Sequence, residues 1–266
     1  MKILLIWLLA ACTSEAIAQP LAEKVDGLDS MYTGWLSHVL RYWSPKGFES
    51  ESTRSLTLTC IATANEDKYV GMLQRMTIRA GISVVENILD DVAHYRDLFP
   101  GTVDVQVVPG SRNGNRFVTA WEQRVPVFFL PNVTYELAYL VDKTTPGRAV
   151  YRYKLRRGDK LTASDGMVVL DAVGPDTTQF TEYDFFNARW GPLPTALVWR
   201  ESLQGAFLSD VAIKLKAENS SWSYERIASE GERLIQSEAE RIEQCFSQRQ
   251  DAEVLINLSR IAPHQR

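Results

Sequence analysis

A histidine with two carboxylate neighbours is the first group in this sequence that could do chemistry. His94 lies in the segment ILDDVAHYRDLFPG, residues 88–101, and follows Asp90 and Asp91 at helical spacing. A carboxylate at that spacing can orient an imidazole as a general base. However, charged groups are common at helix ends, and the sequence holds no Gly-x-Ser-x-Gly motif for a nucleophile. We therefore interpret the segment as a solvated helix corner and assign no catalytic residue.

Metal and phosphate sites receive no support from the sequence. The three histidines, His38, His94 and His264, lie far apart, and no His-x-x-x-His or Cys-x-x-Cys spacing occurs. We therefore predict neither a metal site nor a cofactor. The turn PGSRNGN, residues 109–115, lacks the Lys-Ser/Thr pair of a phosphate-binding loop and is more typical of a hairpin.

Basic residues alternate with large apolar ones in YRYKLRRGDK, residues 151–160. Alternation places Arg152, Lys154 and Arg156 on one face of a strand, where they could meet anionic head groups or nucleic acid. We favour the solvated outer face of a sheet. The net charge of −4 gives no general attraction to nucleic acid, so we expect no such partner.

Short turns divide the middle of the chain into strands. A strand is expected at 70–80, followed by two short helices, the first with Ser83 as its N-cap, then six strands, and then a long helix from 195 to about 216. The six strands are 103–109, 116–129, 133–142, 148–157, 161–173 and 178–190. This order predicts an α+β fold, in which a curved antiparallel sheet of about seven strands wraps on the long helix. A cavity is expected where inward side chains do not fill the space between sheet and helix.

The first residues predict export. Residues 3–11 form an apolar run that follows a lysine and is too short to span a bilayer, but suits the core of a signal peptide. Ala-Ile-Ala at 16–18 has the pattern of a signal-peptidase site, so the mature protein is expected in the periplasm or secreted. Leu-Ala-Ala-Cys at 9–12 resembles a bacterial lipobox, and a lipoprotein acylated at Cys12 is the alternative.

Extra elements are expected on both sides of the core. An amphipathic pattern between 28 and 43 predicts a helix, 56–64 suggests a short strand, and a charged helical stretch runs from about 223 to 258. If Cys12 is removed or acylated, Cys60 and Cys245 remain, an even number in an oxidising compartment. A disulfide between them is one hypothesis, and two separately buried thiols is the other.

The core resembles the START-related, polyketide cyclase-like (SRPBCC) superfamily, which has the helix-grip fold. Leu89, Asp91, Tyr95, Pro100 and Gly101 match the pattern L-x-D-x-x-x-Y-x-x-x-x-P-G that ends a helix in that superfamily, and 192–219 resembles its gripping helix. The resemblance covers the core alone, and together with the N-terminal pattern and the added segments it predicts four parts of the chain. They are a signal peptide at 1–18, an N-terminal helical extension at 19–69, a START-like helix-grip domain at 70–217 and a C-terminal helical extension at 218–266.

Polar residues at inward positions are the best sign of a cavity. On the last strand, Glu182 and Asp184 share one face, Tyr183 and Phe185 share the other, and periodicity leaves open which face looks inward. The candidate cavity residues are Trp121, Glu122, Tyr135, Tyr139, Tyr183, Phe185, Leu203 and Phe207.

The predicted function is that of an exported binding protein or carrier for a hydrophobic or amphipathic small molecule, such as a lipid, with transient membrane contact. Two alternatives stay open. One is a cyclase- or aromatase-like enzyme that uses acid and base residues of the cavity. The other is an interaction module whose cavity is filled by its own side chains.

Overall fold

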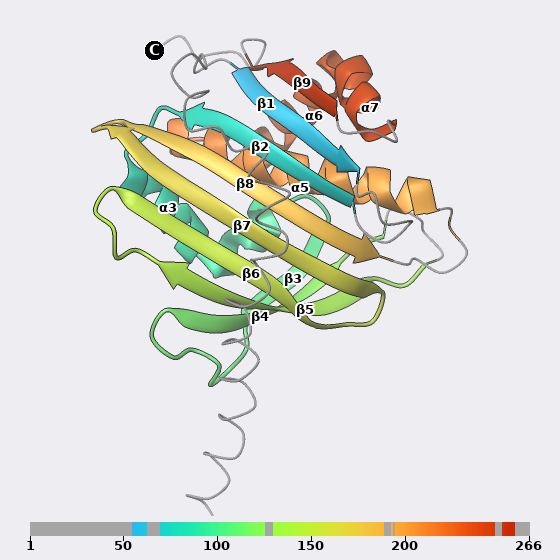
Figure 1. The fold of residues 1–266 in the computed structure, drawn as a ribbon, viewed down its shortest axis with the longest axis horizontal. Coiled ribbons are helices and arrows are strands. Elements are labelled where there is room, and N and C mark those ends of the chain that lie inside the picture. The colour runs from blue at the N-terminus through green and yellow to red at the C-terminus, as the bar shows by residue number, and fades with distance from the viewer. Residues whose placement is uncertain are drawn as a thin grey trace, which may run out of the picture.

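One antiparallel sheet organises the part of the chain that the structure, a computed structural model, describes. These residues are 55–62, 70–125, 130–188, 193, 195–247 and 252–258. The predicted signal peptide, the lipobox cysteine Cys12, the helix at 28–43, His38 and His264 lie outside them. Nine strands follow the order β3-β4-β5-β6-β7-β8-β2-β1-β9, and every neighbouring pair is antiparallel (Figure 1).

The strands are β1 (Ser55–Ala62), β2 (Val70–Ile78), β3 (Thr102–Val107), β4 (Arg116–Gln123), β5 (Val133–Asp142), β6 (Arg148–Gly158), β7 (Leu161–Gly174), β8 (Thr177–Ala188) and β9 (Ala252–Asn257). The helices are α3 (Ile82–Asp90), η2 (Val92–His94), α4 (Tyr95–Leu98), α5 (Thr195–Glu218), α6 (Tyr224–Ser237) and α7 (Ala239–Ser247). Among these described helices, none has both the length and the apolar character needed to cross a membrane.

The predicted order of strand, short helices, six strands and long helix is confirmed from β2 to α5. The count of about seven strands is too low, because β1 pairs with β2 and β9 pairs with β1. The helical prediction to about 258 is also wrong at its end, where 252–257 form a strand. Ile256 is buried there and Leu255 is 57% exposed, so the segment alternates as a strand does. A short apolar run of this kind is ambiguous between helix and strand when read alone.

The core lies between the sheet and α5, which crosses behind β2 and β8 (Figure 1). Its 24 residues make it about 36 Å long, enough to traverse the sheet. Phe207 and Val211 of α5 are fully buried and pack with Leu56, Met76 and Phe180 of the sheet in one cluster. α6 begins at Ser223, whose side chain accepts a hydrogen bond from the Arg226 amide, and it packs against α5.

The segment 88–101 is a corner that turns α3 into β3. The Tyr95 hydroxyl donates a hydrogen bond to the carbonyl of Leu89 near the end of α3. Gly101 has a φ of +76°, and its carbonyl accepts a 2.8 Å hydrogen bond from the Arg124 amide. At the other end of α3 the N-cap is Gly81, and the prediction of Ser83 is wrong. A Cβ at Gly81 would lie 2.8 Å from the Pro175 carbonyl oxygen, so the close approach of the β7–β8 turn selects glycine there.

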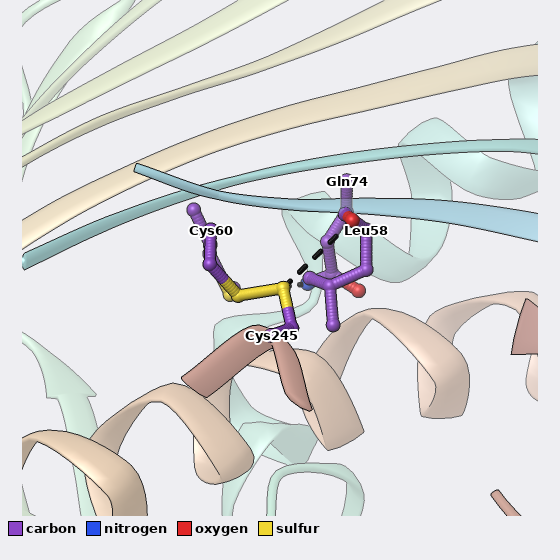
Figure 2. The surroundings of a disulfide bond; sticks show 5 residues. Leu58, Cys60, Gln74 and Cys245 are labelled. Carbon is purple, nitrogen blue, oxygen red and sulfur yellow. Dashed lines mark hydrogen bonds between the residues drawn. A yellow bond between two sulfur atoms is a disulfide. The ribbon is translucent and has the colours of Figure 1, made fainter. Parts of the chain in front are cut away.

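A disulfide joins Cys60 of β1 to Cys245 of α7, as Figure 2 shows, which confirms the first hypothesis for these cysteines. The Cα atoms are 5.6 Å apart, within the usual range for disulfides, and both cysteines are buried. The bond closes a separation of 185 residues and fastens the C-terminal helices to the sheet.

Removal of this disulfide is expected to destabilise the protein. In Cys60→Ala/Cys245→Ala the unfolded chain regains the entropy of a very long loop. We expect the free energy of unfolding to fall by about 2–4 kcal/mol, with about 5 kcal/mol as the limit for a loop of this length. Urea unfolding without reductant measures the difference. Wild-type protein unfolded in reductant is the control, and it should resemble the double variant. Equal stability of variant and oxidised wild type would contradict the expectation.

Candidate ligand site

A cavity of roughly 370 Å³ lies between the concave face of the sheet and α5. Its sheet wall comes from β4 to β8, and its helix wall from residues 201–209 of α5. Phe99, Pro100 and Gly101 stand at its border, so the corner that turns α3 into β3 also shapes the cavity. The volume is near the lower end of pockets that hold small molecules, about 300–1,000 Å³.

Aromatic rings form one wall of this cavity. Strand alternation and register bring Trp121 opposite Tyr135, and Tyr139 opposite Tyr153. The Trp121 and Tyr135 rings are nearly parallel with centroids 6.0 Å apart, and the Tyr139 and Tyr153 centroids are 5.6 Å apart. The Trp121 indole N–H donates to the Thr119 hydroxyl at 2.7 Å, which satisfies its polar edge. We call these four residues the aromatic wall.

Three carboxyl groups gather at another part of the cavity. Glu182 and Asp184 are two residues apart on β8 and share its inward face, and both line the cavity. Asp210 of α5 is 1% exposed, and a side-chain hydrogen bond joins it to Glu182. The Tyr153 hydroxyl donates a further hydrogen bond to Glu182 Oε1 at 3.1 Å. We call Glu182, Asp184 and Asp210 the acid cluster.

Gly166 of β7 makes the hydrogen bond from Tyr153 to Glu182 geometrically possible. In the sheet register Tyr153 lies opposite Gly166, and Gly166 lies opposite Asp184. A Cβ at Gly166 would lie only 1.9 to 2.3 Å from atoms of the Tyr153 ring. Because that Cβ is missing, the ring crosses over β7 and its hydroxyl reaches Glu182 on β8. The aromatic wall and the acid cluster therefore meet at Tyr153.

Desolvation raises the pKa of all three carboxyl groups of the acid cluster. Desolvation raises the pKa of Glu182, and desolvation together with the neighbouring Glu182 charge raises the pKa of Asp184 to about 8. The pKa of Asp210 is raised further, because it is buried, lies beside Glu182 and shares a hydrogen bond with it. The hydrogen bond with Asp210 partly offsets the rise in the pKa of Glu182.

The acid cluster has no basic partner within the described residues. No ion pair there joins any of its three carboxyl groups to arginine or lysine, and Asp184 Oδ1 and Asp210 Oδ2 are buried without a hydrogen-bond partner. Lys214, one turn beyond Asp210 on α5, instead donates to Glu218 at 2.5 Å. The described residues also contain no group of histidine, cysteine and acidic side chains placed to hold a metal ion.

The structure separates the predicted cavity residues into three sets. Trp121, Tyr135 and Tyr139 line the cavity. Leu203 and Phe207 of α5 are buried in the core and do not line it. The remaining three residues lie elsewhere. Glu122 accepts a 2.5 Å hydrogen bond from Asn132 and lines a second groove. Tyr183 and Phe185 belong to a separate apolar cluster on the other face of β8.

The parity of β8 explains this difference. Phe180 is fully buried in the main core, so 182, 184 and 186 follow it inward, and the aromatic residues between them face outward. A rule that simply turns the more apolar face of the strand inward would have placed Tyr183 and Phe185 in the cavity. The i, i+2 pair of acids was the signal for the cavity side, whereas Asp210 and Gly166 carried no signal in the sequence, because their roles come from the elements opposite them.

His94 is part of a solvated corner, as interpreted from the sequence. Its Nδ1 lies 2.6 Å from Asp91 Oδ2, and the two side chains are 52% and 48% exposed. Its ring is stacked on Tyr224 of α6 with centroids 6.0 Å apart. Arg156 and Arg157, from the basic strand, both pair with Glu136, Arg156 at 2.6 Å.

Replacing Asp184 with asparagine is expected to flatten the pH dependence of stability. Folded Asp184 keeps its proton to about pH 8, whereas an unfolded aspartate loses it near pH 4. The folded state therefore binds more protons in this window, and its stability falls as pH rises, by up to about 1.4 kcal/mol per pH unit for one proton. Asp184→Asn lacks this loss, so its stability relative to wild type should increase from about pH 5 to about pH 8.

Urea unfolding across that pH range measures the effect. Asp176→Asn, in the exposed turn between β7 and β8, is the matched control and should run parallel to wild type. An Asp184→Asn curve that also runs parallel to wild type would count against a buried, protonated Asp184.

No family model and no curated protein matches the sequence. Solved structures do match it. A STAR-related lipid transfer protein from Xanthomonas axonopodis is 14% identical, with a TM-score of 0.47 over 64% of this chain and 95% of that one. The human StarD13 lipid transfer and protein localization domain is 13% identical, with a TM-score of 0.48 over 68% and 96%. The Zhui aromatase/cyclase from Streptomyces is 18% identical, with a TM-score of 0.46 over 63% and 96%. The predicted helix-grip arrangement, an antiparallel sheet with a long helix packed across it, is present in the described residues.

Proposed function

We propose that this protein is an exported binding protein or carrier that holds a hydrophobic or amphipathic small molecule between its sheet and α5. The observation that carries the proposal is the cavity of roughly 370 Å³ beneath the aromatic wall, inside an otherwise packed core. The cavity is partly open to solvent, which gives a ligand a way in, and its volume lies within the range of pockets that hold small molecules. The cavity gives no support to the alternative of an interaction module with a filled core.

Export is the part of the proposal that rests on the N-terminal sequence and on the cysteines. A disulfide such as Cys60–Cys245 persists in the periplasm or outside the cell and is rare in reducing compartments. This supports export through the expected signal peptide at 1–18, with acylation at Cys12 as the alternative.

An enzyme of the cyclase or aromatase kind is the second candidate, and the acid cluster favours it. A carboxyl group such as Asp184, with a pKa raised to about 8, can act as a general acid near neutral pH. A change in the mass of a bound compound, lost in Glu182→Gln, would support this candidate. A compound released unchanged supports the carrier.

The affinity for a linear alcohol should grow with its chain length until the cavity is full. Each buried methylene contributes about 0.8 kcal/mol, which corresponds to about a fourfold gain in affinity. Displacement of the neutral dye Nile red by alcohols from butanol to dodecanol measures this series. A plateau after an initial rise marks the filled cavity, whereas no displacement at any length would overturn the carrier proposal.

A large side chain at Gly205 is expected to close the cavity without unfolding the protein. Gly205 lies on the α5 wall, and a Cβ built there meets no atom within 4 Å. In Gly205→Trp the indole would occupy ligand space, and binding of Nile red should weaken at least about tenfold. The stability should hold or rise by up to about 1 kcal/mol, because glycine is unfavourable inside a helix.

Gly205→Ala is the matched control, since it makes the same helix-favouring change but leaves the cavity open. It should bind Nile red as wild type does. Equal binding by both variants would place the dye outside the cavity.

A further inference from the structure

We propose that the ligand carries a basic amine, whose protonated nitrogen lies against the acid cluster of Glu182, Asp184 and Asp210 while its apolar part lies along the aromatic wall. This inference rests on the proposed function and adds the chemical class of the head group. It follows from the absence of a cation beside three carboxyl groups in the described part of the chain, from their unused hydrogen-bond acceptors and from the rings that border them.

The unused acceptors match the donors of an ammonium group. Asp184 Oδ1 and Asp210 Oδ2 have no hydrogen-bond partner, although both atoms are buried. Buried polar atoms are nearly always satisfied in native structures, and an exception calls for an explanation such as a missing ligand or ion. A primary ammonium has three N–H donors, enough for both free oxygens and for Glu182.

The side chains around the acid cluster favour a cation over an anion. Tyr135, Tyr139 and Tyr153 lie close enough for the carboxyl groups to influence their ionisation, and all three line the cavity. The faces of aromatic rings attract cations. Arg124 also lines the cavity, beside Gly101 at its border. A carboxylate or phosphate placed at the acid cluster would meet three acids that form no ion pair with arginine or lysine among the described residues, so an anionic head group is disfavoured there.

Binding of an ammonium should release protons. Desolvation raises the pKa of all three carboxyl groups in the empty protein, and Asp184, with a pKa of about 8, holds its proton at neutral pH. A cation at hydrogen-bond distance favours the carboxylate form. The other titratable groups that face the cluster among the described residues are Tyr135 and Tyr139 of β5 and Tyr153 of β6. Asp165 of β7 lies opposite Phe185 on the other face of the sheet, and its charge adds to the rise in the pKa of Asp184. Burial raises the pKa of these tyrosines well above neutral, so they stay protonated. We therefore assign the released proton to the acid cluster, and affinity for an amine should increase from about pH 5 to about pH 8.

The test compares three ligands of equal chain length: octylamine, 1-octanol and octanoate. Each is titrated against the Nile red complex of the full-length protein at pH 7. Octylamine should bind at least about tenfold more tightly than octanol, and octanoate should bind most weakly. Calorimetry in buffers of different ionisation enthalpy should show release of about one proton with octylamine and none with octanol.

Variants then locate the effect. Glu182→Gln/Asp210→Asn should reduce the preference for octylamine over octanol to within about threefold, and a cooperative urea unfolding transition shows that the variant is folded. Asp165→Asn is the matched control, because Asp165 is on the next strand and does not line the cavity. It should keep the full preference.

Other results would contradict the amine inference, the carrier proposal or both. If octanol and Nile red bind but octylamine binds no more tightly, the amine inference fails and the carrier proposal stands. If the preference survives in Glu182→Gln/Asp210→Asn, the amine lies elsewhere and the inference fails. If none of the ligands binds, the proposed function itself fails.

Discussion

The structure depends on a mismatch between one helix and one sheet. Nine strands spaced about 4.8 Å apart span roughly 38 Å, whereas a helix with its side chains is only about 10–12 Å wide. α5 therefore buries the inner faces of β2 and β8, α3, α4 and α7 cover other parts, and α6 packs against the helices. Under β4 to β6 the space next to α5 is lined with aromatic residues but is not filled. The cavity arises because narrow helices cover the wide, curved sheet incompletely.

The acid cluster is the costly part of this arrangement. Removing carboxyl groups from water without basic partners opposes folding. Raised pKa values, the hydrogen bond from Tyr153 to Glu182 and the hydrogen bond between Glu182 and Asp210 limit this unfavourable free energy. Gly166 is needed for the hydrogen bond from Tyr153, since any side chain at this position would displace the Tyr153 ring. A sheet with the same aromatic wall and apolar residues at 182, 184 and 210 would pack more easily. The polar groups are therefore better explained by recognition than by stability.

The sequence predicted those features that arise from local signals. Turns and alternation placed the strands from β2 to β8, and the Pro100-Gly101 corner was recognised from its motif. Counting the cysteines suggested the disulfide but left two separate thiols as an equal alternative, which the structure decides. The prediction from sequence failed where contacts with elements distant in the chain determine the structure. The inward parity of β8 depends on Phe180 packing in the main core, β9 is a strand because β1 offers it an edge, and Asp210 matters only because Glu182 lies opposite.

The edge formed by β1 and β9 also has a consequence for the order of assembly. Leu56 pairs with Ile256 across the antiparallel β1–β9 ladder, so these partners come from opposite ends of the described chain. Contacts between residues so distant in sequence form slowly, because the entropy of closing a long loop must be overcome first. The strands from β2 to β8 and α5 are contiguous in the chain and can assemble without this edge. β9 joins last and shields β1, whose free edge could otherwise pair with another molecule during the interval after the cavity has formed.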